Sequence, residues 1–255
     1  MKSVKIYIER KNIIAGMTLK RDDRLERNNM ALHVTKNEEH VIENRKRLAE
    51  TLKVPLNHFV CANQTHSANF YEVTGEDKGR GALEQGSAIP NTDALYTKEA
   101  NIVLCTFTAD CVPLMFYNEK ANIIGVIHSG WKGTVQEIVK KTLSHIIETE
   151  SCSAEDFHVY IGMALSQKRF EVDEDVYQLY DDLGYADPFI SYHENTNKYH
   201  IDNQLVVKTQ CEQIGIPEKQ IAIDRTCTYD SEVGFSYRED KQAGRHLAFI
   251  VRKTD

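Results

Sequence analysis

The chain has 255 residues, of which 41% are hydrophobic and 27% charged, and it carries a formal net charge of -7 with a pI near 5.8. This composition is typical of a globular chain that is long enough to bury a large core. The acidic balance argues against nucleic acid or an anionic membrane surface as the main partner, although a local group of Lys and Arg can still bind a small anion.

No segment has the pattern of an export signal or a membrane span. The first 20 residues alternate charged and apolar side chains and lack the continuous apolar stretch of a signal peptide. No run of about 18 apolar residues occurs. The six cysteines are scattered, without a Cys-x-x-Cys pair. We therefore expect a cytoplasmic protein with reduced thiols.

The pattern of apolar residues predicts strands and helices that alternate along the chain. In chain order it predicts a helix over 37–54, strands over 102–108, 112–117 and 122–128, a helix over 133–150, a strand over 157–162, helices over 171–184 and 202–216, and a strand over 246–252. Asp202 suits the N-cap of its helix and Gly215 the stop. With no repeat or linker, this order predicts one α/β or α+β domain over residues 1–255, with at least one mixed sheet.

The segment 108–141 combines core signals with reactive side chains. Asp110 and Cys111 precede one apolar strand, and His128 ends the next, 17 residues further on. A hairpin between the two strands can bring the thiol and the imidazole together. Ser-Gly-Trp-Lys-Gly then leads into a helix, which directs free backbone N–H groups toward the end of the strand and suits an anion.

A third candidate, His66, lies upstream in a polar Gln-Thr-His turn. His66, Cys111 and His128 form a reasonable zinc-binding set that leaves a fourth position for water or substrate. Their spacing matches no compact zinc finger, so packing and a metal-free Cys–His nucleophile pair stay open as alternatives. His193 and His200 fall in a segment, 191–202, that the pattern predicts to be a polar, exposed loop.

Basic residues recur near the C-terminus, close to glycines and aromatic residues. These are Arg225, Arg238 and Arg245. They are either surface charges or the lining of a phosphate or carboxylate site, because the planar guanidinium suits both anions.

Together these residues resemble the motifs of the laccase-domain (YfiH-type) family, whose members are also described as multifunctional purine nucleoside phosphorylases. The resemblance rests on TADCVP followed by HSGWKG, on the upstream QTH and VIENR segments, and on CTYD, FSYRED and GRHLAFI near the C-terminus. It covers nearly the whole chain, in order.

The resemblance implies a single layered α/β/β/α domain, with mixed sheets between helical layers, of the YfiH-like cysteine-hydrolase fold. It implies a catalytic zinc at His66, Cys111 and His128. It also implies phosphorolysis of adenosine, inosine and methylthioadenosine, and hydrolytic deamination of adenosine. Copper-dependent polyphenol oxidation and amidase-type reactions are ascribed to other members.

The chain departs from the family motifs where substrate would be held. Lys132 replaces the arginine of the Gly-Trp-Arg-Gly turn, and Lys20 falls where an early arginine is expected. A lysine can hold phosphate as a point charge but lacks the bidentate fork of arginine. The three metal-ligand positions are intact.

We therefore expect a cytoplasmic zinc enzyme that acts on purine nucleosides and phosphate, with no nucleic-acid or membrane partner and an oligomeric state left open. Asp110 is expected near the metal as an orienting group or proton acceptor. The candidates to hold substrate or phosphate are Lys132, Arg238, Arg245, Arg225 and Lys20.

Three other interpretations remain open. The first is a metal-free hydrolase or amidase with Cys111 as nucleophile and His128 as base. The second is a copper-dependent polyphenol oxidoreductase, whose multicopper form is disfavoured because the sequence holds no His-x-His pair. The third is a zinc-stabilised interaction protein.

Overall fold

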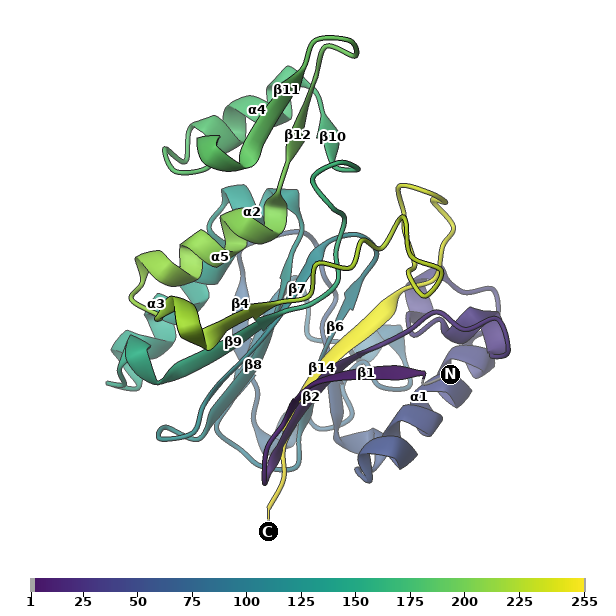
Figure 1. Ribbon diagram of the computed structural model, residues 1–255. Coiled ribbons are helices and arrows are strands. Elements are labelled where there is room, and N and C mark those ends of the chain that lie inside the picture. Colours follow the sequence, from purple (N-terminus) through teal and green to yellow (C-terminus); the bar gives the residue numbers. More distant parts are fainter. Residues whose placement is uncertain (1–2, 255) are drawn as a thin grey trace.

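The computed structural model describes residues 3–254 and contains two mixed β-sheets packed face to face (Figure 1). The first sheet is antiparallel except for its last strand, and its order is β1 (Val4–Glu9), β2 (Ile13–Thr18), β14 (His246–Arg252), β6 (Val103–Thr108), β3 (Phe59–Cys61). The second sheet is antiparallel in its centre and parallel at both edges, in the order β13 (Ile221–Ile223), β9 (Phe157–Ile161), β7 (Val112–Asn118), β8 (Ile123–Ser129), β5 (Ala94–Thr97), β4 (Phe70–Glu72).

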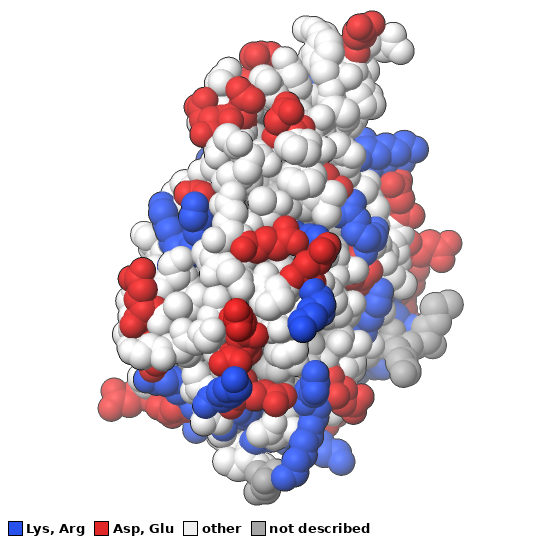
Figure 2. Space-filling model, turned by 60° about the vertical axis from the view of Figure 1, so that its left-hand side comes forward, with Lys and Arg blue, Asp and Glu red and all other residues white. Residues whose placement is uncertain are grey.

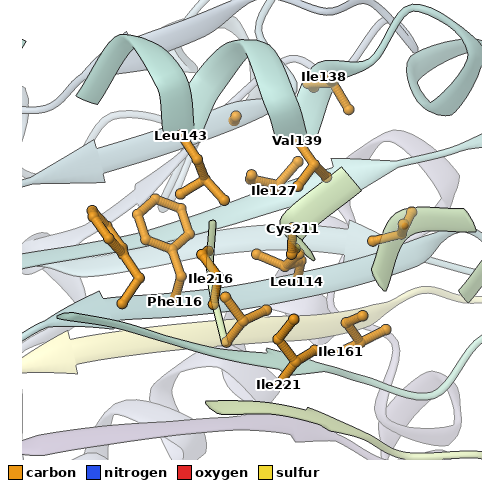
Figure 3. Close-up of a cluster of buried hydrophobic side chains, with 14 of the residues drawn as sticks. Leu114, Phe116, Ile127, Ile138, Val139, Leu143, Ile161, Cys211, Ile216 and Ile221 are labelled. Atoms are coloured by element: carbon orange, nitrogen blue, oxygen red, sulfur yellow. The ribbon is translucent and has the colours of Figure 1, made fainter. Parts of the chain in front are cut away.

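Three apolar clusters show that the fold is layered α/β/β/α. The middle cluster lies between the sheets and includes Leu104 of β6 and Met115 of β7. A second cluster joins α1 (Glu38–Leu52) to the outer face of the first sheet. The third joins α3 (Ile138–Thr149) and α5 (Asn203–Gln213) to the second sheet, with Val139 and Leu143 of α3 above the strands (Figure 3). This mixed α+β fold confirms the predicted fold class.

A small additional unit, called the cap here, is formed by residues 171–201. It contains a three-stranded sheet, β10 (Glu171–Val172), β12 (Lys198–Ile201) and β11 (Ile190–His193), and helix α4 (Glu174–Asp181). Its core includes Tyr180, with Trp131 and Phe170 packed against it from below. Residues 171–197 hold eight Asp or Glu and neither Lys nor Arg. Figure 2 shows acidic side chains at the top of the molecule, where Figure 1 places the cap, and such a surface is unfavourable for nucleic acid.

Most predicted elements are confirmed at close to their predicted bounds. The strands over 102–108, 112–117 and 122–128 correspond to β6, β7 and β8, and the last two form the expected hairpin. The Asp202 side chain accepts a hydrogen bond from the backbone N–H of Leu205 at the start of α5. Gly215 follows that helix with φ +96°, where glycine is favoured.

The predicted helix over 133–150 is wrong in its first part, because two helices occupy this region. A short helix, α2 (Trp131–Val135), is separated from α3 by Gln136 and Glu137. Glu137 has a left-handed backbone with φ +57°, which breaks the ladder of helical hydrogen bonds. The apolar pattern continues across the break because both helices lie above the same sheet.

Two predictions in the cap are also wrong. The helix over 171–184 begins only at Glu174, since Glu171 and Val172 pair with β12. The segment 191–202 is not an exposed loop but contains most of the β11–β12 hairpin, in which His200 is buried. Several N-terminal strands were not predicted at all.

Within residues 3–254, no helix is long and apolar enough to cross a membrane.

Candidate metal and active site

The β7–β8 hairpin brings Cys111 and His128 to the same end of the second sheet. Cys111 immediately precedes β7, and the register pairs Val112 with Ser129 and Pro113 with His128. The predicted hairpin therefore places the thiol and the imidazole side by side, as two adjacent antiparallel strands must do at their common end.

His66 reaches the same place from the turn between β3 and β4. Its Nε2 lies 3.7 Å from the Sγ of Cys111, and its ring centroid lies 4.8 Å from that of His128. The three ligand atoms all lie within 4.8 Å of one another, which makes this the one group of at least three His, Cys, Asp or Glu in the described chain that could hold a metal ion. His128 is buried, Cys111 is partly exposed and His66 is exposed, so the group is open on one side.

The donor set fits a tetrahedral metal with one free position. Bonds of about 2.3 Å to sulfur and about 2.0 Å to nitrogen give an S–N separation of roughly 3.5 Å at a tetrahedral angle, close to the 3.7 Å observed. Gly130 keeps the space clear, since a Cβ there would lie 2.6 Å from Cδ2 of His66 and 2.9 Å from Sγ of Cys111. Two imidazoles and a thiolate suit zinc and also copper.

An aspartate that sequence reasoning missed, Asp93, supports this group. Its Oδ1 lies 2.8 Å from Nδ1 of His128, and its carboxylate also accepts hydrogen bonds from the turn that carries His66. Its side chain is fully buried. The signal available in the sequence was an acid directly before an apolar run at 94–97, and it went unused because β5 was not predicted.

The charges in the group shift one another's pKa values. Burial alone would raise the pKa of the Cys111 thiol, but the charge of His128 and hydrogen bonds with His128 and His66 lower it to about 6. Burial alone would lower the pKa of His128, but Cys111 and Asp93 raise it to about 9. Burial alone would raise the pKa of Asp93, yet His128 and Ser67 lower it to about 2. Cys111 is therefore prepared to act as a thiolate, whether toward a metal or toward a substrate.

A cavity of about 690 Å³ opens directly in front of the group. Four aromatic side chains line it: Phe107 of β6, Trp131 at the start of α2, Phe170 just before the cap and Tyr237 in the C-terminal segment. Three of the predicted basic residues line the same cavity: Lys132, Arg238 and Arg245. A cavity of this size, with aromatic side chains and convergent polar groups, is suitable for a small-molecule ligand.

The sequence model of a family described as multi-copper polyphenol oxidoreductase laccase matches residues 20–253. The chain belongs to this family. Among curated relatives of this laccase family, the protein named purine nucleoside phosphorylase YlmD of Geobacillus stearothermophilus is 35% identical over 230 residues, 89% of this chain and 84% of its own. The protein of the same name from Bacillus subtilis is 32% identical over 249 residues, 95% of this chain and 90% of its own.

Solved structures of laccase-family proteins share the fold. The crystal structure titled Bacillus licheniformis hypothetical protein YfiH superposes with a TM-score of 0.90 at 30% identity, covering 97% of this chain and 99% of that one. The crystal structure of YlmD from Geobacillus stearothermophilus has a TM-score of 0.87 at 32% identity, covering 96% and 93%. The resemblance found in the sequence motifs is thereby confirmed for both family and fold.

In this laccase-family chain, Asp110 contacts the C-terminal segment rather than the three ligand atoms. Its Oδ1 accepts a 2.6 Å hydrogen bond from the hydroxyl of Thr228, and its Oδ2 accepts a 2.8 Å bond from the backbone N–H of Arg238. The guanidinium of Arg238 donates to the carbonyl oxygen of Glu171 in the cap. Asp110 thus holds one wall of the cavity in place.

Two of the predicted substrate-binding residues of this laccase-family chain are not among the residues that line the cavity. Arg225 forms a bidentate ion pair with Asp202, the N-cap of α5. Lys20 follows β2, and its backbone N–H donates to the carbonyl oxygen of Val233. Arg225 therefore joins the C-terminal segment to α5. Of the predicted basic residues, Lys132, Arg238 and Arg245 are the ones that line the cavity.

Proposed function

We propose that the protein is a cytoplasmic, metal-dependent enzyme of purine nucleosides. It cleaves adenosine, inosine and methylthioadenosine with phosphate and also deaminates adenosine by hydrolysis. The observation that carries the proposal is that the His66, Cys111 and His128 donors share one cavity with three cations. The names of the relatives, purine nucleoside phosphorylase, support the same reaction class.

The cavity offers positive charge for an anion and aromatic side chains for a flat ring. Lys132, Arg238 and Arg245 supply the positive charge that phosphate needs. Arg245 also lies over the ring of Tyr237, with 5.6 Å between the guanidinium carbon and the ring centroid, which leaves an aromatic and cationic wall beside the donors. A purine can stack on such a wall.

The bond changes of both reactions can be assigned to this cavity. In phosphorolysis, a phosphate oxygen bonds to the anomeric carbon of the ribose while the carbon–nitrogen bond breaks, and the purine leaves with a proton. In deamination, water adds to the carbon that carries the amino group and ammonia leaves. A bound Zn²⁺ would supply Lewis-acid polarisation beside the reacting atoms, and copper is the second choice of metal. His66, Cys111 and His128 would hold it, and Asp93 would hold His128.

Product analysis with purified protein tests the proposal. Adenosine is expected to give inosine and ammonia with or without phosphate, whereas adenine and ribose 1-phosphate are expected only when phosphate is added. Both reactions should be lost in Cys111→Ser together with stoichiometric metal. If the zinc-loaded protein forms neither product, the nucleoside proposal is wrong.

A second candidate is a metal-free Cys–His hydrolase or amidase, favoured by one observation. Asp93, His128 and Cys111 follow one another in contact, in the order of orienting acid, base and nucleophile. A protein that keeps hydrolysing an amide substrate after complete removal of metal by a chelator would support this candidate. Loss of all activity on chelation, with recovery on adding zinc, would reject it.

A further inference from the structure

We propose that Asp93 is the positioning residue of the His66–Cys111–His128 group, because one buried carboxylate fixes both the ring of His128 and the backbone of the turn that carries His66. The inference rests on the metal site of the proposed function but concerns metal binding, which is measured separately from nucleoside chemistry. Asp93 lies just before β5, 27 residues after His66 and 35 before His128. Asp93 therefore connects the segments of His66 and His128, which are far apart in the sequence.

The contact with His128 selects the nitrogen that is free to bind a metal. The Oδ1 of Asp93 lies 2.8 Å from Nδ1 of His128. A carboxylate only accepts hydrogen bonds, so Nδ1 keeps its proton, and Nε2 is the nitrogen that gives up its proton when a metal binds. The backbone of Asp93 holds the same residue, since its carbonyl oxygen accepts a 2.7 Å bond from the backbone N–H of His128. Ring and main chain of His128 are both oriented by Asp93.

The contacts with the His66 turn fix an unusual backbone conformation. His66 has φ +59°, a left-handed conformation that a residue other than glycine adopts only when its surroundings enforce it. The carboxylate of Asp93 accepts hydrogen bonds from the backbone N–H groups of Thr65, His66 and Ser67 at 3.2, 3.1 and 2.8 Å, and from the Ser67 hydroxyl at 2.7 Å. Three consecutive N–H groups can point at one carboxylate only if the turn is strongly curved, and this curvature directs the His66 ring toward Cys111.

An asparagine at position 93 cannot accept the hydrogen bonds both of His128 and of the turn that carries His66. The two oxygens divide the donors: Oδ1 faces His128 and the N–H of His66, and Oδ2 faces Thr65 and Ser67. An amide has one acceptor and one donor group. In either orientation its NH₂ faces N–H donors, so either the turn loses its acceptor or Nδ1 of His128 must give up its proton. The second outcome places the proton on Nε2, the nitrogen needed by the metal.

Competition with a chromophoric chelator measures the consequence in the full chain. We expect Asp93→Asn to weaken zinc binding about 10- to 100-fold and to change the visible absorption spectrum of the Co²⁺-substituted protein, because the ligand geometry changes.

Asp77→Asn is the matched control: Asp77 is also buried, accepts from the backbone N–H of Thr74 at 3.0 Å and pairs with Arg80, but does not line the cavity. It should lower the melting temperature without altering zinc affinity or the cobalt spectrum. Equal zinc affinity and identical spectra in Asp93→Asn and the wild type would overturn the proposal.

A second measurement needs no variant and covers the case in which Asp93→Asn does not fold. In full-length protein with ¹⁵N-labelled histidine, adding zinc should perturb the Nε2 signal of His128 while Nδ1 stays protonated. A perturbation of Nδ1 would show that Asp93 does not select the ligand atom and would overturn the proposal. Wild-type protein that binds no zinc would reject this inference together with the metal part of the proposed function, whereas zinc binding without nucleoside turnover would reject the proposed function alone.

Discussion

Asp110 accepts a 2.8 Å hydrogen bond from the backbone N–H of Arg238, 128 residues further along the chain. The other carboxylate oxygen accepts from the Thr228 hydroxyl at 2.6 Å. Cys111, a metal-ligand candidate, is the next residue after Asp110. A single pair of adjacent residues therefore connects the candidate metal group to the wall that presents Arg238 to the cavity.

Removing this connection should weaken phosphate binding more than metal binding. We expect Asp110→Ala to raise KM for phosphate about 10-fold, because each lost hydrogen bond to a charged group is worth roughly 1.5–3 kcal/mol and Arg238 becomes free to move. Zinc content should stay stoichiometric. Asp240→Asn in the same segment is a suitable control, since Asp240 is exposed and does not line the cavity. An unchanged KM with a large fall in kcat would instead indicate a direct role of Asp110 in proton transfer.

Gly130→Ala should weaken metal binding while preserving the fold. The added Cβ would lie 2.6 Å from Cδ2 of His66 and 2.9 Å from Sγ of Cys111, so one ligand must move away. We expect zinc affinity to fall at least about 10-fold, measured by chelator competition. Gly86→Ala, with no atom within 4 Å of its added Cβ, should bind zinc as the wild type does. Tight zinc binding by Gly130→Ala would contradict the assignment of His66 and Cys111 as ligands.

Phosphate binding should become tighter when the lysine of the Gly-Trp-Lys-Gly turn is replaced by arginine. Lys132 is exposed at the cavity and its ammonium lies 5.5 Å from the Trp131 ring centroid. We expect Lys132→Ala to raise KM for phosphate about 10-fold and Lys132→Arg to lower it, because a guanidinium binds phosphate through two hydrogen bonds. Lys141→Ala on the exposed side of α3 is the control. If Lys132→Ala leaves KM unchanged, Lys132 does not hold the phosphate.

His246 should make the fold sensitive to mild acid. Its ring is buried between two backbone groups, donating from Nδ1 to the carbonyl oxygen of Thr18 at 2.7 Å and accepting at Nε2 from the N–H of Phe235 at 2.7 Å. Burial, with the charges of Lys20 and Arg245, lowers its pKa from 6.5 to about 4. The unfolded chain then binds more protons between these two pH values.

The free energy of unfolding should therefore fall as the pH decreases from 6.5 toward 4, by about 3 kcal/mol from this group. Urea unfolding at a series of pH values measures the slope. His246→Gln should be less stable at neutral pH but should show a flatter profile, whereas His193→Gln, at an exposed position, should keep the wild-type slope. An unchanged slope in His246→Gln would show that another group causes the acid sensitivity.

Cys111 should be the most reactive thiol of the metal-free protein. Its pKa of about 6, set by His128 against the opposing effect of burial, makes it a thiolate at neutral pH. Alkylation by iodoacetamide should rise with pH through a midpoint near 6, and peptide mass spectrometry should locate the label. Zinc should protect the thiol, and His128→Gln should move the midpoint upward. Faster labelling of Cys152 or Cys227, which are also partly exposed, would contradict this assignment.

Local patterns in the sequence predicted the alternation of strands and helices and singled out the three donors as candidates, whereas the layered arrangement was implied by the family resemblance. The apolar strand that follows Cys111 and the strand that ends with His128 are adjacent in the chain, so a hairpin is the simplest way to pair them, and their common end is then determined. Helix α1 and the N-cap of α5 also follow from signals within a few residues. His66 was found because its turn carries a recognisable motif rather than because its position could be calculated.

The position of Asp93 could be decided only by the tertiary structure. Its contacts reach His66 and His128 across 27 and 35 residues, and they exist because β5 pairs with β8 on one side and β4 on the other. No pattern of hydrophobic residues specifies the order of strands in a sheet. A single acid before an unpredicted strand therefore carried no signal.

The sequence by itself determined which residues could do chemistry, because side-chain type and short-range spacing are written in it directly. Only the tertiary structure decided which of them act together: it placed Lys132, Arg238 and Arg245 around one cavity, paired Arg225 with Asp202, and turned the segment 191–202 into a hairpin with His200 inside. The physical reason is that these contacts join segments whose separation in the chain is large, and sheet order and cap packing bring them together.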